Sequence, residues 1–563
     1  MLTGSIVALL ALTAASTASP LLDLGTTTSR RLVVRQSSSS PTIQVMNGTL
    51  GGRYEPTFEQ DVFLDIPYAQ PPVGNLRLAN PQPYNATWNG TRDATAWGNV
   101  CPGIGISSTP NATLGQNYVL DEDCLNINII RPSGTQEGDD LPVLFWIYGG
   151  GFIQGTANDP RYNGSYLVRR SVENGEPVIF ASINYRLGSF GFPAGESAAQ
   201  EDVLNLGLKD QRRALHWVQD NIASFGGAAD KVTIWGQSAG GASTTAQLLA
   251  YGGRDEGLFR GAIIDSGIFA QQNATLQQPA WSRFLDAAGC AEADDELACL
   301  RSLPYADYYS AMLNSSSSAV LPDGSFVRKS AMNAIAAGEI VQVPILVGAT
   351  RDEATSGIGA PVGLQNETAL RTAVAARYSD IISSSPNASI DALVAAYPDD
   401  NEIGCPFGTG DGAVSTGLQD KRSNAMWTDS IHAGSRLLAQ KHGYAAPVWS
   451  WRFHQVPQNS TIDAGAAHAN ELPYLFRVLE RTPRTPLGNR PGDLGLSLMM
   501  QDYWLNFVNH LNPNKGAAQD LYWPTYDKSS QNMIFQNNKT RLEKDDYRQE
   551  AIQLQIDLAL GKA

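Results

Sequence analysis

Residues 232–243 constrain this chain more than any other segment, because they join a strand pattern to a serine flanked by glycines. The first four alternate as on a short β-strand, and the small residues after 240 tolerate a helix. Between them, residues 236–240 match G-x-S-x-G with Ser238 at the centre. A sharp turn from strand to helix needs glycines on both sides of the exposed serine, because larger side chains would collide. The segment therefore predicts a strained strand–turn–helix unit, with a Gly/Ser-rich turn without chemistry as the alternative.

The rest of the chain predicts an α/β fold in which helices flank a mostly parallel central sheet. Strands separated by helical stretches are typical of such a fold, and the region 354–444, which mixes helix patterns with loops, is interpreted as a large helical insert. Residues 63–77 contain so many prolines that we expect an ordered surface segment or a strand-edge loop there. The expected strands lie at 141–148, 178–184, 261–265, 343–348 and 447–453, and helical patterns cover 206–225 and 498–511.

The N-terminal residues are expected to lie outside the folded domain. Residues 1–19 contain an apolar stretch that ends in small residues and is too short to span a bilayer, which predicts a signal peptide. Residues 20–41, with their Thr and Ser runs, are expected to be a disordered lead or a pro-segment. Residues 42–563 are expected to form a single α/β domain, since large enzymes of this class need not divide.

Charge and glycosylation signals favour a secreted protein. The formal net charge of −15 argues against nucleic acid or an anionic membrane as a partner. No later apolar run is long enough for stable membrane insertion, and the sequence contains no signal for an oligomeric state. The candidate glycosylation sites of the form N-x-S/T are Asn47, Asn85, Asn89, Asn111, Asn163, Asn273, Asn314, Asn366, Asn387, Asn459 and Asn538.

The five cysteines fit an oxidising compartment. Their spacing suggests two local loops, one between Cys101 and Cys124 and one between Cys290 and Cys299. Cys405 is left over, because five cysteines cannot form three pairs.

A serine hydroxyl becomes a nucleophile when a histidine takes its proton and a carboxylate orients that histidine. His454 and His468 both follow the expected strand 447–453, where a serine hydrolase of this fold places its base. His468 is favoured because its small-residue loop can approach a site closely. The acid is expected after the strand 343–348, where Asp352 and Glu353 both fit. Three glycines at 149–151 follow another apolar run and favour a loop whose amides face a bound oxyanion.

Several motifs occur in an order that resembles the type-B carboxylesterase/lipase family of α/β-hydrolases, which includes cholinesterases and secreted fungal lipases. The resemblance covers the chain from about Thr42 to the C-terminal region. The motifs are Ile-Pro-Tyr-Ala at 66–69, Glu-Asp-Cys-Leu-Asn at 122–126, Tyr-Gly-Gly-Gly-Phe at 148–152, Asn-Tyr-Arg-Leu at 184–187, Asn-Leu-Gly-Leu-Lys-Asp-Gln at 205–211, Asn-Ile-Ala-Ser-Phe-Gly-Gly at 221–227, Gly-Gln-Ser-Ala-Gly at 236–240, Asp-Glu at 352–353, His-Ala-Asn-Glu-Leu-Pro at 468–473 and Tyr-Trp at 503–504.

The resemblance implies a role for each candidate residue. Ser238 would be the nucleophile, Glu353 the acid and His468 the base, and the disulfides would be Cys101–Cys124 and Cys290–Cys299. The residues whose backbone amides would form the oxyanion hole are Gly150, Gly151 and Ala239. Two positions depart from the family pattern, since Tyr148 stands where many relatives have His and Gln237 where many have Glu. We expect both departures to leave the chemistry in place, because neither removes a catalytic group.

The sequence thus predicts a secreted serine carboxylic-ester hydrolase that forms an acyl-enzyme and needs no metal or cofactor. Its partner would be a small-molecule or lipid ester. An interfacial lipase or an acyl transferase is the alternative among enzymes. A non-catalytic cholinesterase-like binding domain is the alternative outside them, disfavoured because Ser, Glu and His are all kept.

Overall fold

The computed structural model describes residues 40–562 except for 106–117, 269–273, 316–318, 357, 379–385, 413–416, 459, 462, 478–489, 491 and 518. The expected signal peptide and all but the last two residues of the expected lead lie outside the described residues. Three of the candidate glycosylation sites, Asn111, Asn273 and Asn459, also lie outside them.

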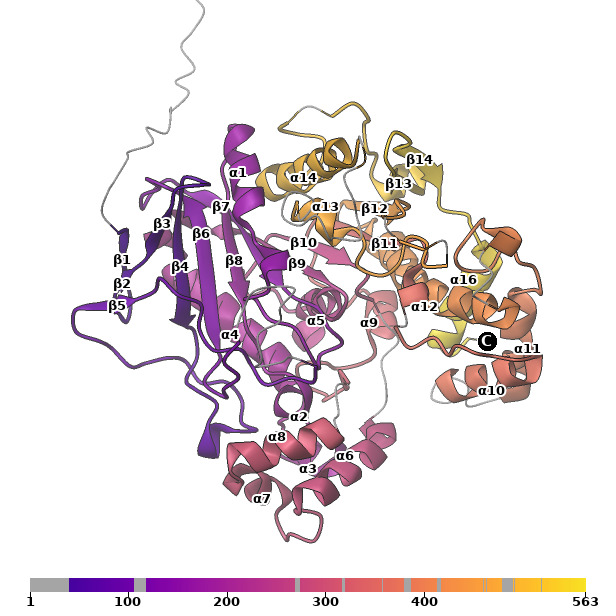
Figure 1. Cartoon of the computed structure of the whole chain (residues 1–563), viewed down its shortest axis with the longest axis horizontal. Helices are drawn as coiled ribbons and strands as arrows, with labels where there is room; N and C mark the ends of the chain where they lie inside the picture. Colours follow the sequence, from indigo (N-terminus) through magenta and orange to yellow (C-terminus); the bar gives the residue numbers. More distant parts are fainter. Residues whose placement is uncertain are drawn as a thin grey trace, which may run out of the picture.

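A large twisted sheet runs through the molecule (Figure 1). Within the described residues it has eleven strands in the order β14-β13-β12-β11-β10-β9-β7-β8-β6-β4-β3. The strands from β13 to β8 are parallel to their neighbours, and the pairs at both ends are antiparallel. The strand bounds are β3 Arg53–Glu55, β4 Gln60–Pro67, β6 Asn126–Pro132, β7 Leu141–Ile147, β8 Ile179–Ile183, β9 Gly227–Gln237, β10 Gly261–Asp265, β11 Ile345–Thr350, β12 Val448–Phe453, β13 Gln531–Phe535 and β14 Arg541–Lys544, with β1 Thr42–Val45, β2 Gly48–Gly51 and β5 Thr91–Asp93 in a second small sheet.

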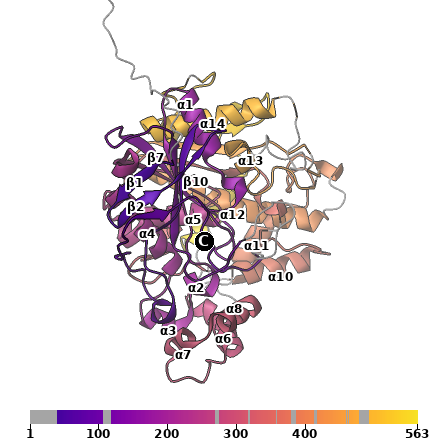
Figure 2. The same cartoon turned by 60° about the vertical axis from the view of Figure 1, so that its left-hand side comes forward.

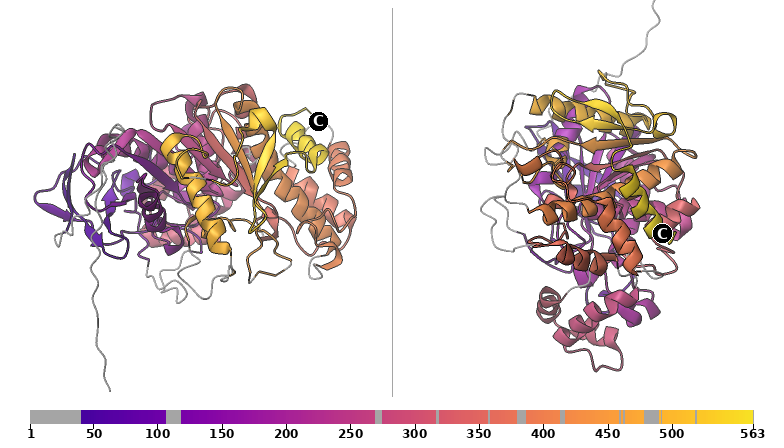
Figure 3. Two further views of the ribbon diagram at one scale, coloured as in Figure 1. Left: turned by 90° about the horizontal axis from the view of Figure 1, so that it is seen from above. Right: turned by 90° about the vertical axis from the view of Figure 1, so that its right-hand side faces the viewer.

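Helices cover both faces of the large sheet. Helices α1 and α14 contact one face, and α4, α5 and α12 contact the other (Figures 1 and 3). The helix bounds are α1 Ser165–Glu173, α2 Gly188–Gly191, α3 Gly195–Gln200, α4 Leu206–Asn221, α5 Ala239–Gly253, α6 Ala274–Ala288, α7 Glu296–Ser302, α8 Tyr305–Asn314, α9 Ala331–Ala337, α10 Glu367–Tyr378, α11 Pro386–Ala396, α12 Leu418–His442, α13 Leu472–Leu475, α14 Asp493–His510, α15 Tyr526–Ser529 and α16 Gln549–Ala559. Short 3₁₀ turns are η1 Gly74–Leu76, η2 Pro160–Tyr162, η3 Ile222–Phe225, η4 Glu353–Ser356 and η5 Gly410–Gly412.

Two helical regions extend from this framework. The expected insert contains α10, α11 and α12, which pack with the C-terminal helix α16 around a core of their own. Helices α3, α6, α7 and α8 form a second lobe with a separate core, seen at the bottom of Figure 2. The Cys290–Cys299 disulfide lies in this lobe, and the Cys101–Cys124 disulfide has a Cα–Cα distance of 5.0 Å. Cys405 is buried and forms no disulfide with any described residue.

The expectation for residues 63–77 is wrong at its start. Strand β4 reaches from Gln60 to Pro67 inside the large sheet, and Phe63 and Leu64 on it are fully buried. The prolines end this strand instead of preventing it, because the first of them occupies its last position.

The candidate glycosylation sites that the structure describes differ in exposure. The side chains of six candidate sites are exposed, and those of Asn47 and Asn163 are half-buried; the exposed sites are Asn85, Asn89, Asn314, Asn366, Asn387 and Asn538. Asn47 donates its amide to the carbonyls of Tyr84 and Ala86, which engages the nitrogen that a glycan would modify. A search of the described helices finds none long and apolar enough to cross a membrane.

Candidate active site

Ser238 stands at the turn between the central strand β9 and helix α5. Its φ of +58° and ψ of −123° are strained for a residue with a side chain. The flanking glycines are required by sterics. A Cβ on Gly236 would lie 2.1 Å from the carbonyl oxygen of Gly240, and one on Gly240 would lie 2.0 Å from that of Ile147. The Ser238 amide donates to the Asp265 carbonyl at 2.8 Å, which fixes the turn against β10.

Glu353 and His468 are in direct contact although 115 residues separate them. His468 Nδ1 hydrogen-bonds to Glu353 Oε2, and the carboxylate is fully buried. Its other oxygen, Oε1, accepts from the amide of Thr350 at 2.7 Å and from the hydroxyl of Ser266 at 2.5 Å. These bonds hold the carboxylate in one orientation, so it can align the imidazole. Burial alone would lower the pKa of His468, but the charge and hydrogen bond of Glu353, with the charge of Glu471, raise it above its usual value.

Asp352, the other candidate acid, connects loops instead of contacting the imidazole. Its Oδ1 accepts from the amide of Phe407 at 2.8 Å, and its Oδ2 accepts from the amide of Ala466 at 2.9 Å. Arg351 donates to Oδ2 at 2.9 Å. Because Ala466 precedes His468 by two residues, Asp352 fixes the loop that carries the histidine.

His454, the other candidate base, lies in a cationic setting. Its ring is buried, and its amide donates to the carbonyl of Phe535. Burial, with the nearby charges of Arg452 and Arg351, holds its pKa far below the usual value. The alternative that His454 acts as the base is therefore disfavoured by its surroundings.

The glycine loop after β7 lies directly against the serine turn. A Cβ on Gly149 would lie 2.4 Å from the carbonyl oxygen of Gln237. Gly150 has φ +114° and Gly151 φ +64°, backbone conformations that glycine adopts without steric strain. Tyr148 stacks on Tyr185 at 4.5 Å between ring centroids, and each hydroxyl bonds the other residue's carbonyl. Tyr148 therefore supports the start of this loop by packing.

Gly150→Ala tests this loop. If the Gly150 amide is an oxyanion donor, as the sequence predicts, we expect its displacement to lower kcat/KM for a soluble ester on the order of 10²-fold or more. The added Cβ would lie 2.3 Å from the Gln154 carbonyl oxygen, and the positive φ disfavours it as well. The matched control is Gly175→Ala, which also has positive φ but meets no described atom within 4 Å. Equal rates for both variants in an ester assay would contradict a role for the Gly150 amide.

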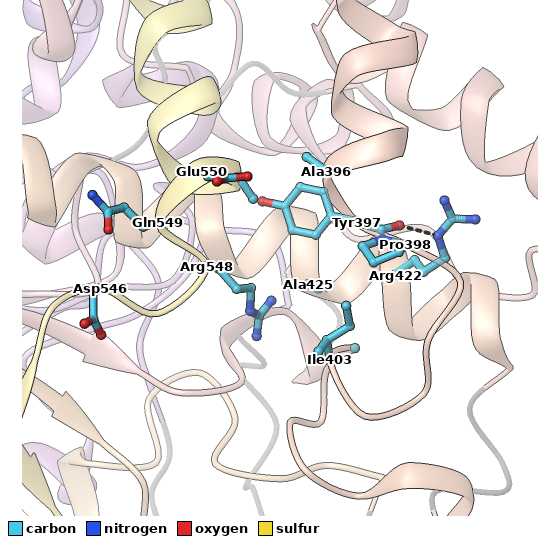
Figure 4. Close-up of a pocket in the computed structure, with 12 residues that line it drawn as sticks. Ala396, Tyr397, Pro398, Ile403, Arg422, Ala425, Asp546, Arg548, Gln549 and Glu550 are labelled. Carbon is cyan, nitrogen blue, oxygen red and sulfur yellow. Dashed lines mark hydrogen bonds between the residues drawn. The ribbon is translucent and has the colours of Figure 1, made fainter.

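A separate cavity of about 410 Å³ lies between the N-terminus of α16 and the α11–α12 connection (Figure 4). Its two arginines already have partners. Arg422 donates to the carbonyls of Tyr397 and Val394, and Arg548 pairs with Asp429 at 3.4 Å. These contacts hold the helical insert together, and the catalytic candidates do not line the cavity.

A model of the carboxylesterase family matches residues 39–555. The chain belongs to this family. It is an α/β-hydrolase and a carboxylic ester hydrolase, as the motifs predicted.

Some relatives of this chain are named lipases, and others are named esterases. The chain is 33% identical over 554 residues to a secreted triacylglycerol lipase of Gibberella zeae, covering 92% of this chain and 90% of the relative. It is 31% identical over 513 residues to the para-nitrobenzyl esterase of Bacillus subtilis, covering 88% and 95%. The crystal structure of Aspergillus niger EstA has a TM-score of 0.78 and 27% identity, covering 93% and 99%.

Sequence reasoning missed several residues that support this carboxylesterase site. Ser266 and Thr350 hold the buried carboxylate, and Asp265 and Glu471 add two further buried acids nearby. Each is an ordinary residue at or near the end of a strand or loop. The pairing of β10 with β11 brings Ser266 to Glu353, whereas Thr350 lies only three residues before Glu353 in the chain.

Proposed function

We propose that this carboxylesterase is a secreted serine hydrolase that cleaves carboxylic esters through an acyl-enzyme. The observation that carries the proposal is the contact between His468 and buried Glu353, together with the strained turn at Ser238. Secretion is supported by the candidate signal peptide, the exposed candidate glycosylation sites and relatives that are named as secreted lipases.

In the proposed mechanism, Glu353 holds His468 so that its Nε2 takes the proton of Ser238. The serine oxygen attacks the ester carbonyl, and the developing oxyanion is stabilised by backbone amides. Protonated His468 then donates to the departing alcohol, leaving an acyl group on Ser238. Water loses a proton to His468, attacks that acyl group and releases the carboxylic acid, which restores the serine. The proposed oxyanion donors are the amides of Gly150, Gly151 and Ala239.

The proposed substrates are small-molecule or lipid esters in solution, with an interfacial lipase as the second candidate because several relatives are named lipases. Hydrolysis of tributyrin, measured below and above its solubility limit, distinguishes an esterase that acts on dissolved esters from an interfacial lipase. We expect the rate to saturate smoothly with dissolved substrate, as for an esterase. A sharp rise once an emulsion forms would favour the lipase. A parallel series of p-nitrophenyl esters of graded acyl length would define the acyl preference.

A further inference from the structure

Gln237 contacts the histidine that the proposed mechanism uses as a base. It is the last residue of β9 and is almost fully buried, with 3% of its surface exposed. Its Nε2 lies 3.3 Å from His468 Nε2. A Cβ built on Gly149 would lie 3.3 Å from its Oε1. The side chain therefore lies close to both the glycine loop and the imidazole.

The chemistry of this contact follows from the other side of the ring. Glu353 is a carboxylate and accepts, so neutral His468 carries its proton on Nδ1 and a lone pair on Nε2. The Gln237 amide nitrogen can only donate. The contact is therefore a hydrogen bond into the lone pair that must later receive the proton of Ser238.

The neighbourhood of His468 already contains three fully buried acids. Glu353 contacts the ring, and Asp265 is the register partner of Gln237 on β10 and accepts from Trp235 Nε1 at 2.6 Å. Both carboxyl oxygens of Glu471 lack a hydrogen-bond partner among the described residues. Burial, partly offset by Trp235, raises the pKa of Asp265 to about 8, and burial beside Asp265 and Glu353 raises the pKa of Glu471 well above its usual value. A neutral amide at position 237 adds no further acid to this buried cluster.

We propose that Gln237 is a positioning residue that holds His468 in its neutral, proton-accepting form through the lone pair of Nε2. The inference rests on the proposed serine mechanism. A donor into the lone pair stabilises neutral imidazole over imidazolium, and it turns repulsive once Nε2 carries a proton. The protonated ring is thereby directed away from Gln237 and toward the departing alcohol.

The test compares pH profiles of kcat/KM for p-nitrophenyl butyrate in the wild type, Gln237→Met and Gln237→Glu. The rate falls as pH drops and His468 gains a proton, so the acidic limb reports its pKa. Methionine is similar in size and lacks the donor, and we expect its limb at higher pH than the wild type. A carboxylate beside the imidazolium should move the limb up further, by about one to three pH units.

Two results would overturn the inference. The first is a uniform loss of rate with an unchanged limb, which is the result expected of a purely structural side chain. The second is an acidic limb that lies at lower pH in Gln237→Met than in the wild type. This would mean that the amide oxygen faces the ring and favours imidazolium. Titration of His468 by NMR in a Ser238→Ala background gives the same comparison without turnover. Hydrolysis that does not depend on Ser238 would instead refute the proposed function, and this inference with it.

Discussion

Replacing Ser238 with alanine is expected to lower kcat/KM for soluble esters on the order of 10⁴- to 10⁶-fold. In the proposed mechanism the substitution removes the attacking oxygen, so no acyl-enzyme would form, and the residual rate would come from binding and the proposed oxyanion donors alone. The fold should survive, because the amide of Ser238 keeps its bond to Asp265 and the hydroxyl is not needed to cap α5. Initial rates with p-nitrophenyl butyrate measure the loss, and a thermal melt confirms folding.

The matched control is Ser243→Ala on the same helix. Ser243 is buried and its hydroxyl donates to the Ala239 carbonyl at 2.8 Å, and it accepts from Gln211 at 2.9 Å. Removing it should cost stability on the order of 1 kcal/mol while leaving the rate within a few-fold of wild type. A Ser238→Ala enzyme as active as this control would show that Ser238 is not the nucleophile.

The second large effect is expected at Glu353. Glu353→Gln should lower kcat on the order of 10³- to 10⁴-fold, because an amide that donates to Nδ1 would favour the wrong tautomer of His468. The neighbouring Asp352→Asn provides the comparison. Its partners are the amides of Phe407 and Ala466, so the change should loosen the loop and reduce thermal stability, with kcat within roughly tenfold of wild type.

The two substitutions separate alignment of the base from support of its loop. Each removes one charge, at adjacent positions that are both fully buried. Steady-state kinetics and thermal melts on both variants therefore allow the loss of kcat and the loss of stability to be compared between the two positions. A larger loss of kcat in Asp352→Asn than in Glu353→Gln would reverse the assignment of the acid.

Local patterns predicted the parts of this fold that local sterics decide. The expected strand 261–265 is the same as β10, because a short apolar run bounded by polar residues leaves little choice. The need for glycines beside Ser238 was predicted from steric collisions. In the structure these collisions would be with the backbone carbonyl oxygens of neighbouring residues. Residues 206–225 form α4 and a short 3₁₀ turn, as the apolar spacing indicated.

Choices that depend on tertiary contacts could not be made from the residues themselves. Asp352 and Glu353 are adjacent, and only the approach of the His468 loop decides which carboxylate contacts the ring. His454 and His468 both follow β12, and two of the three arginines near His454, Arg351 and Arg541, come from segments distant in sequence. The lobe of α6 to α8 was not predicted, because its short helices form their own small core away from the sheet.

Labelling with a fluorophosphonate, followed by peptide mass spectrometry, tests the central claim most directly. Such a reagent reacts with a serine that a histidine has activated, and a tetrahedral adduct is held by the oxyanion donors. For the folded wild-type enzyme we predict one adduct per chain, on the peptide that contains Ser238, with loss of ester hydrolysis in proportion to labelling. Continued hydrolysis with Ser238 unmodified, or inactivation through an adduct at another residue, would contradict the proposed mechanism.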